Sequence, residues 1–217
     1  MISDIDAFIR ANTVPTRTPL LPEITLHLAT EVTPLWQATE ETLSRTGLPP
    51  PYWAFAWVGG QAVARHILDH PDSVAGRQVF DFASGSGIVA LAAARAGAAT
   101  VTAAEIDPIA VAAIRLNAAA NGCILAVDGG DRIGDPLDGF DIISAGDVCY
   151  EKPMSDRVMP WLRALAGAGK TVLLGDPGRA YRPQDGLVEV ARHHVPTSVE
   201  IEDRPVREAV VWRVLPG

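Results

Sequence analysis

Residues 79–90 constrain the fold of this chain more than any other stretch, and they read Val-Phe-Asp-Phe-Ala-Ser-Gly-Ser-Gly-Ile-Val-Ala. An apolar run carries an acid near its end, a turn of small residues follows, and the turn opens into an alanine-rich segment. A second apolar run, residues 99–104, is followed by another acid, Glu105. A strand, a glycine-rich turn, a helix and a second strand that ends at an acid together predict a βαβ unit that binds a nucleotide.

The rest of the chain predicts an α/β domain built around this unit. Apolar and β-branched runs predict seven strands, at residues 78–82, 99–104, 123–127, 140–145, 170–174, 195–201 and 209–215. Helical patterns separate the first five strands, so we expect a Rossmann-like, mostly parallel sheet with helices on both faces. The short connection between the last two strands favours a hairpin, which makes the last strand antiparallel.

The predicted domain begins at Trp53 and covers residues 53–217. Residues 1–52 are predicted to form an N-terminal extension and lid, with short helices at residues 2–11 and 34–47 and a proline-containing loop at residues 12–22. A further helix is predicted at residues 184–193, between the fifth and sixth strands.

Composition and charge limit the classes of binding partner and the cellular compartment that we expect for this chain. The chain has 217 residues, 48% of them hydrophobic, and a formal net charge of −8. An acidic surface repels phosphate backbones and anionic lipid, so nucleic acid and membrane are disfavoured as partners. Cys123 and Cys149 are the only cysteines, and neither lies in a metal-binding array. The acidic N-terminus lacks the pattern of a targeting segment, so we expect a cytoplasmic protein with reduced thiols and no metal site.

Two features favour S-adenosylmethionine over a dinucleotide as the bound cofactor. Gly85, Gly87 and Ala90 satisfy the G-x-G-x-x-G/A pattern that dinucleotide-binding proteins share. However, Asp81 would face a pyrophosphate unfavourably, whereas it suits the amino group and sulfonium of S-adenosylmethionine. The predicted hairpin of strands six and seven is also typical of a methyltransferase sheet. Glu105 fits either cofactor, because both place ribose hydroxyls there.

Several motifs carry a resemblance to a known family. Residues 79–87 resemble motif I of class I, or seven-β-strand, methyltransferases, with Ala83 in place of the usual first glycine. Residues 53–60 (WAFAWVGG), 117–122 (NAAANG) and 147–151 (DVCYE) resemble the DxxY group of protein-lysine methyltransferases. Residues 174–181 (LGDPGRAY) are similar to the branch that methylates the β subunit of electron transfer flavoprotein. The resemblance covers roughly residues 34–217. It implies methyl transfer from S-adenosylmethionine to lysine ε-amines of a protein substrate, with that β subunit as the expected one.

The resemblance implies that Asp147 and Tyr150 are the catalytic residues. We expect Asp147 to bind and orient the ε-ammonium of the lysine, and Tyr150 to wall the channel and assist proton loss. Desolvation in an aromatic pocket would lower the pKa of the lysine. Two structural alternatives stay open: Asp147 could cap the helix that starts near Pro153, and Tyr150 could be a core aromatic residue.

Cofactor contacts are predicted around the glycine turn and in the WxxGG segment. Trp57, Gly59 and Gly60 are assigned to the amino-acid end of the cofactor, with plain helix packing as the alternative. An acid after the third strand commonly meets the adenine amine in this fold, and Asp128 is chosen there over Asp131. The predicted cofactor-binding set is Trp57, Gly59, Gly60, Asp81, Ala83, Gly85, Gly87, Glu105, Ile106 and Asp128.

Arg179, Tyr181 and Arg182 are expected on the substrate rim or, alternatively, on an ordinary solvated surface. Two other functions stay open at this point. One is a small-molecule N-methyltransferase, which would need a closed pocket, and the other is a non-catalytic cofactor-binding module. The intact acids at the three strand ends count against a degenerate site. The sequence predicts no oligomeric state.

Overall fold

The computed structural model of the chain describes residues 4–30, 50–197 and 204–217. The strands of the main sheet are β3 (Gln78–Phe82), β4 (Thr100–Ala104), β5 (Ala126–Asp128), β6 (Ile142–Gly146), β7 (Thr171–Asp176), β8 (Leu187–Pro196) and β9 (Val206–Val214). The helices are α1 (Ile5–Asn12), α4 (Val58–Asp69), α5 (Ile88–Arg95), α6 (Pro108–Ala120) and α7 (Lys152–Gly167), with short 3-10 turns η1 (Tyr52–Ala54) and η2 (Pro71–Ser73).

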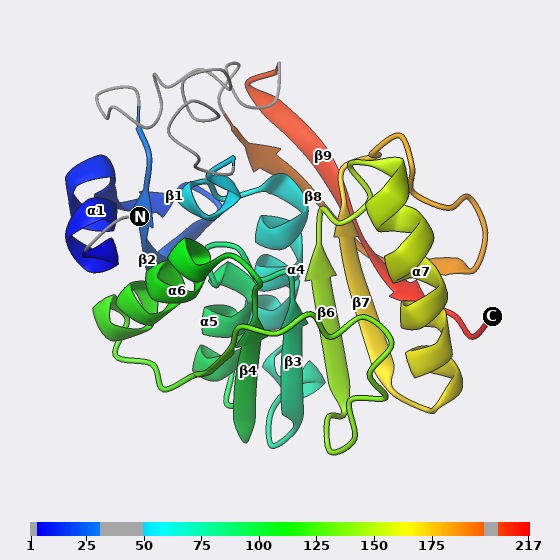
Figure 1. Cartoon of the computed structure of the whole chain (residues 1–217). Helices are drawn as coiled ribbons and strands as arrows, with labels where there is room; N and C mark the ends of the chain where they lie inside the picture. Colours follow the sequence, from blue (N-terminus) through cyan, green and yellow to red (C-terminus); the bar gives the residue numbers. More distant parts are fainter. Residues whose placement is uncertain (1–3, 31–49, 198–203) are drawn as a thin grey trace.

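The seven strands follow the order β5-β4-β3-β6-β7-β9-β8 (Figure 1). The β3 strand pairs in parallel with both β4 and β6, and the chain therefore reverses its direction of winding at β3. The last strand, β9, pairs antiparallel with both β7 and β8. The predicted fold class, a mostly parallel Rossmann-like sheet with its last strand antiparallel, is confirmed.

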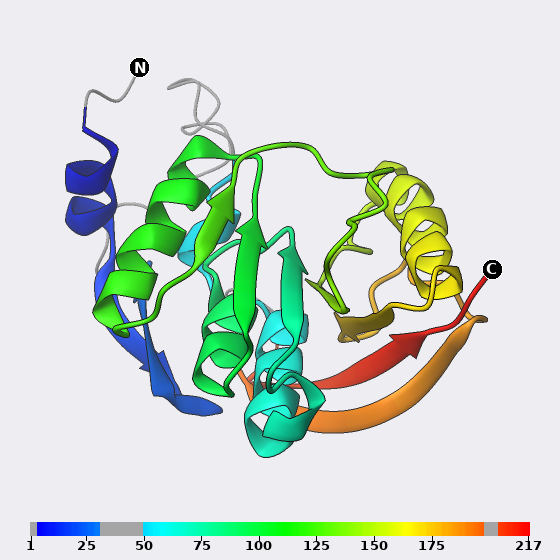
Figure 2. The same ribbon diagram turned by 90° about the horizontal axis from the view of Figure 1, so that it is seen from below.

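Alternating side chains of the central strands build two apolar layers, one on each face of the sheet. Val79 of β3 packs into the layer that contains α4 and α5, whereas Phe80 and Phe82 pack into the layer that contains α7. Figure 2 shows α7 on the opposite side of the sheet from α4 and α5. A strand buried on both faces reads as a continuous apolar run, which is why β3 stands out in the sequence.

An N-terminal hairpin of β1 (Val14–Thr18) and β2 (Leu21–Leu28) docks onto α6 through two asparagines. Asn117 accepts the His27 N–H at 2.7 Å and donates to the Ser86 carbonyl oxygen at 2.8 Å. One turn later, Asn121 accepts the Thr25 N–H at 2.9 Å and donates to the Thr25 carbonyl oxygen at 2.6 Å. Residues four apart lie on one face of a helix, so both asparagines of the NAAANG motif face β2. Their side chains form hydrogen bonds with backbone groups of Thr25 and His27, as a neighbouring strand would.

The helix predicted at residues 184–193 is wrong, because the chain forms the edge strand β8 there. A register shift between Glu189 and Ala191 interrupts the alternation of inward and outward side chains. Val188 and Val190 are both exposed on this edge. The period of two is therefore broken within the strand, and the pairing that stabilises it comes from β9, far along the chain.

The loop predicted at residues 12–22 is also wrong, since it contains β1. Pro15 is tolerated in β1 because this strand pairs with β2 alone and leaves its other edge unpaired among the described residues. The predicted helix at residues 34–47 lies outside the described residues, as do residues 1–3 and 31–49 of the predicted lid. Among the helices that the structure describes, none is long and apolar enough to cross a membrane.

Replacing Asn117 by Ala is expected to lower the free energy of unfolding by about 2–4 kcal/mol. Asn117 is fully buried, so the substitution leaves the His27 N–H and the Ser86 carbonyl without their partner away from water. Urea unfolding measures the change, and Arg115→Ala, on the exposed face of the same helix, is the control. Equal effects of the two substitutions would contradict this account of the hairpin.

Candidate active site

A cavity of about 390 Å³ opens where β3, β4 and β6 end. Its floor comes from residues at or just after the last positions of these strands, namely Ala83, Glu105 and Asp147. In an open α/β sheet, ligands bind outside the carboxyl ends of the strands at the point where the winding reverses. Both the location and the volume are therefore those of a small-molecule site.

The glycine turn between β3 and α5 forms one wall of this cavity. Ala83, Gly85 and Gly87 have φ angles of 51°, 54° and 82°, in the left-handed region that favours glycine. Ala83 and Gly85 line the cavity, whereas Gly87 faces α6, where a Cβ would lie 3.3 Å from Ile114. The turn thus needs small residues at these positions to bend sharply and to let α6 approach from behind.

Asp81 lies behind the cavity wall and holds the glycine turn. Its carboxylate accepts hydrogen bonds from the Ser84 hydroxyl and, at 2.9 Å, from the Ser144 hydroxyl of β6. The side chain is 1% exposed, and burial raises its pKa to about 6. Asp81 is absent from the cavity lining, and its contact with the cationic end of a ligand stays a prediction. In the structure, the carboxylate ties the turn to β6.

Glu105 lines the cavity at the end of β4 and accepts three backbone N–H groups. Its Oε2 accepts from Gly85 at 3.1 Å, and its Oε1 accepts from Ile106 at 2.8 Å and from Asp107 at 3.3 Å. Burial raises its pKa above the ordinary value for a glutamate, although these donors act in the opposite direction. The carboxylate is held in one orientation beside the glycine turn, with Ile106 next to it on the cavity lining.

The N-terminus of α4 lies against the ends of β6 and β7 with almost no space between backbones. A Cβ at Gly59 would lie 2.6 Å from Asp147 Oδ2 and closer still to the Gly175 carbonyl. A Cβ at Gly146 would lie 2.7 Å from the Gly60 nitrogen. Neither Gly59 nor Gly60 belongs to the cavity lining. Packing, the alternative that the sequence left open, explains the lack of a side chain at Gly59, whereas a Cβ at Gly60 would meet only Ile88 and Val89 at ordinary contact distances.

Asp147 stands at this junction and faces the cavity. Its φ of 58° turns the chain sharply after β6, and its N–H donates to the Gly175 carbonyl at 2.9 Å. Its Oδ2 accepts the Gly60 N–H at 3.1 Å, a favourable position for a carboxylate at a helix N-terminus. Its Oδ1 accepts from Arg179 at 2.8 and 3.2 Å. The N-cap of α7 is Glu151, so Asp147 does not cap the helix that the sequence suggested.

Aromatic side chains form the wall of the cavity next to Asp147. The Tyr52 ring lies 5.6 Å from the Tyr150 ring and 5.9 Å from the Trp57 ring, centroid to centroid. Trp57 Nε1 donates to the Tyr52 carbonyl at 2.8 Å, which fixes this wall to the start of α4. Tyr150 is 43% exposed and is therefore not a core residue. Desolvation raises the pKa of its phenol to about 12, so the hydroxyl is neutral at physiological pH.

After β5, the residue that reaches the cavity is Asp131 and not Asp128. Asp128 Oδ2 pairs with Arg132 at 2.6 Å, and its Oδ1 accepts the Gly130 N–H, so its carboxylate shapes the loop. Asp131 pairs with Arg157 at 2.9 Å, and the hydrogen bond from Arg157 lowers the pKa of Asp131. Of the two acids that the sequence proposed, the geometry favours Asp131.

Seven of the predicted site residues line the cavity, namely Trp57, Ala83, Gly85, Glu105, Ile106, Asp147 and Tyr150. The other five are not among the lining residues, namely Gly59, Gly60, Asp81, Gly87 and Asp128. Sequence reasoning missed Tyr52, which follows three consecutive prolines at the end of the predicted extension and lid. It left Arg179 on an undefined rim, although Arg179 lines the cavity. Arg182 instead lies over the Trp212 ring, 4.7 Å from its centroid.

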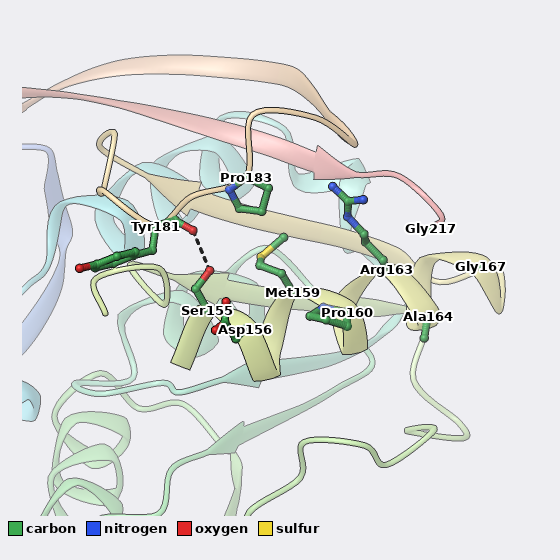
Figure 3. A pocket seen from close by; sticks show the side chains of 10 residues that line it. All are labelled: Ser155, Asp156, Met159, Pro160, Arg163, Ala164, Gly167, Tyr181, Pro183 and Gly217. Carbon is green, nitrogen blue, oxygen red and sulfur yellow. Dashed lines mark hydrogen bonds between the residues drawn. The ribbon is translucent and has the colours of Figure 1, made fainter. Parts of the chain in front are cut away.

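A larger surface hollow of about 740 Å³ lies between α7 and the segment around Tyr181 and Pro183 (Figure 3). Ser155 donates to the Tyr181 carbonyl at 2.7 Å across it. None of the glycine turn, the strand-end acids or the aromatic wall borders this hollow. Tyr181, predicted on the substrate rim, therefore belongs to this hollow and not to the cavity. Among the described residues, no group of three or more His, Cys, Asp or Glu could hold a metal ion.

The fold is that of the seven-stranded, Rossmann-like methyltransferases. Among solved structures, the chain is similar to magnesium protoporphyrin IX methyltransferase from Synechocystis PCC 6803 with bound SAH, with a TM-score of 0.51 and 20% identity over 70% of this chain and 79% of that chain. Residues 66–141 match the family described as Ribosomal protein L11 methyltransferase (PrmA).

Two curated relatives identify the family of methyltransferases to which the chain is similar. The electron transfer flavoprotein β subunit lysine methyltransferase of Danio rerio is 38% identical over 97% of this chain and 83% of its own length. The protein of the same name from Homo sapiens is 34% identical over 98% of this chain and 83% of its own length. The chain belongs to this family of protein-lysine N-methyltransferases.

Gly59→Ala is expected to lower the free energy of unfolding by about 1–3 kcal/mol through overpacking against β7 and Asp147. Gly60→Ala is the matched control, since a Cβ there meets only Ile88, at 3.4 Å, and Val89, at 4.0 Å. Alanine at Gly60 is expected to be neutral or to stabilise the helix by up to about 1 kcal/mol. Urea unfolding of both variants measures the contrast, and two similar values would contradict the packing described for the junction.

Asp81→Asn is expected to gain stability relative to the wild type as the pH rises. The folded protein holds the Asp81 proton up to a pH of about 6, compared with an ordinary value of 3.8. The stability that accompanies protonated Asp81 is therefore complete below about pH 4 and is lost as the pH rises through 6. Urea unfolding at pH 4 and pH 8 should show a shift of about 2–3 kcal/mol in favour of the variant. A difference independent of pH would contradict this role.

Proposed function

We propose that this protein transfers methyl groups from S-adenosylmethionine to lysine ε-amines of the electron transfer flavoprotein β subunit or of a protein with a similar lysine-bearing surface. The observation that carries the proposal is Asp147, a carboxylate 8% exposed at the base of an aromatic-walled cavity. A buried carboxylate beside aromatic rings suits the cationic end of a lysine side chain. The names of the curated relatives support the choice of substrate.

The residues on the glycine-turn side of the cavity fit the cofactor. Gly85 leaves the floor open, since the nearest atom to a Cβ there, the Tyr52 carbonyl oxygen, would be 4.0 Å away. Glu105 offers a fixed carboxylate for ribose hydroxyls, and Ile106 and Ile133 offer apolar contact for a planar base. We assign Asp131 to the adenine amine, and Asp81 and Gly87 to support of the turn. When bound, S-adenosylmethionine supplies an electrophilic methyl carbon.

Asp147 and the aromatic wall prepare the lysine. A free lysine amine has a pKa near ~10.4 and must lose a proton before it can act as a nucleophile. We assign Asp147 to orienting the arriving ammonium through its carboxylate. Tyr52, Trp57 and Tyr150 then limit its hydration, which favours the neutral amine. Because the Tyr150 phenol stays protonated to a pH of about 12, we assign Tyr150 to the wall and to hydrogen bonding and not to a phenolate base.

The N-terminal part of the chain contributes to the cavity as well. Pro50 and Tyr52 line it, which supports the proposal that residues 1–52 act as an extension and lid over the domain formed by residues 53–217. The reduced thiols of Cys123 and Cys149 are compatible with a reducing compartment, and we propose the cytoplasm.

The substrate is tested by incubating the purified enzyme with labelled S-adenosylmethionine and the purified β subunit, and then with a whole-cell lysate. We expect the label on lysine residues of the β subunit, located by mass spectrometry. The label confined to small molecules in the lysate would contradict a protein substrate and would favour the small-molecule alternative.

Asp147→Asn is expected to lower kcat/KM by about 100-fold or more, because the lysine loses its charged anchor and its orientation. Tyr150→Phe keeps the aromatic wall and is expected to retain activity within about tenfold. Calorimetric binding of S-adenosylhomocysteine verifies that both variants keep an intact cofactor site. A larger loss for Tyr150→Phe than for Asp147→Asn would reverse these assignments.

A further inference from the structure

The lysine-binding position proposed at Asp147 is held by a cation of the chain itself. Arg179 donates from Nε and from a terminal nitrogen to Asp147 Oδ1, at 3.2 and 2.8 Å. The other carboxylate oxygen, Oδ2, faces the protein interior through the Gly60 N–H. The Arg179 guanidinium therefore occupies the carboxylate oxygen that faces away from α4 and toward the cavity.

The surroundings of this guanidinium are those expected for the lysine. Its central carbon lies 5.9 Å from the Trp57 ring centroid, within the range of a cation–π contact. The side chains of Arg179 and Asp147 are 18% and 10% exposed. One long cationic side chain thus reaches from the rim between an aromatic ring and the carboxylate, as the substrate side chain would.

A cation at this position pairs with the buried Asp147 carboxylate when no substrate lysine is bound. A carboxylate as deeply buried as Asp147 is destabilising when no cation faces it. Exchanging one cation for another keeps the carboxylate paired before and after the lysine arrives. The exchange also makes the affinity for the lysine depend on how readily Arg179 leaves.

The geometry of the loop allows the Arg179 side chain to move while its backbone stays fixed. Asp176 Oδ1, at the end of β7, accepts the N–H groups of Gly178 and Arg179 at 2.7 and 2.8 Å. The backbone of this turn is therefore anchored to the sheet by a carboxylate that is 1% exposed. In the exchange, Arg179 leaves Asp147 by rotation about its side-chain bonds, with the backbone of the turn still anchored.

We propose that Arg179 is a displaceable stand-in for the acceptor lysine, which holds the lysine position at Asp147 until the substrate side chain replaces it. Arg179 is in this sense a specificity-determining residue, because only a side chain that is long enough and basic enough competes for the carboxylate. The proposal rests on the proposed function of Asp147.

Binding without the cofactor tests the exchange directly. The affinity of the purified electron transfer flavoprotein β subunit is measured by calorimetry for the wild type, Arg179→Ala and Arg95→Ala. Arg95 lies exposed at the far end of α5, so its loss changes the net charge equally. We expect Arg179→Ala to bind about three- to tenfold more tightly than the other two, since no internal cation has to leave. Equal or weaker binding by Arg179→Ala overturns the proposal.

Arg179→Lys provides a chemical readout of the same position. If residue 179 occupies the acceptor site, its neutral amine attacks the cofactor methyl carbon. The N–C bond forms, the C–S bond breaks with its electron pair left on sulfur, and the proton of the amine passes to water. We expect a methyl mass shift on the peptide that contains residue 179, with a first-order rate constant that does not depend on enzyme concentration. Arg182→Lys, which faces Trp212, should acquire none.

The outcomes separate the two proposals. An Arg179→Lys enzyme that methylates the β subunit but not itself overturns the stand-in role and leaves the proposed function intact. A wild-type enzyme that methylates no protein lysine at all overturns the proposed function, and the stand-in role with it.

Discussion

The close approach of α4 to the ends of β6 and β7 is the contact on which the site depends. Gly59 and Gly60 on the helix meet Gly146 and Gly175 on the strands, and side chains at Gly59, Gly146 or Gly175 would collide with backbone atoms. This contact brings the first turn of α4 to Asp147, whose carboxylate accepts the Gly60 N–H. The N-terminus of α4 thereby holds the Asp147 carboxylate in place. Trp57, the N-cap residue of the same helix, positions the aromatic wall beside it.

The cavity is consequently assembled from two halves that are held by different carboxylates. Asp81 ties the glycine turn to β6 through Ser84 and Ser144, and Glu105 ties the same turn to the end of β4. On the other side, Asp147 joins α4, β7 and Arg179. Each acid satisfies backbone or hydroxyl donors that would otherwise be unpaired near the cavity. The division matches the two tasks of a methyltransferase, since one half suits a nucleoside and the other suits a cationic acceptor.

Features of the fold and the site that depend on residues close together in the sequence could be predicted, whereas those that depend on residues far apart could not. The buried runs of β3 and β4 and their closing acids are local, so the sheet and the positions of Glu105 and Asp147 were predictable. The sequence left the role of Gly59 open between cofactor binding and packing, because its partner Gly175 lies in a strand far along the chain. The β8 strand was misread as a helix because a bulge breaks its alternation and β9 supplies its hydrogen bonds. The position of Arg179 on Asp147 likewise follows only from the folded loop.

Asp147 is the proposed binding point of the acceptor lysine. The measurement that tests it most directly is a crystal structure of the enzyme with S-adenosylhomocysteine and a lysine-containing segment of the electron transfer flavoprotein β subunit. The account predicts the lysine ε-nitrogen within hydrogen-bond distance of Asp147 Oδ1, beside Trp57 and Tyr150, with Arg179 displaced. A lysine that enters the cavity elsewhere while Arg179 remains on Asp147 would contradict it.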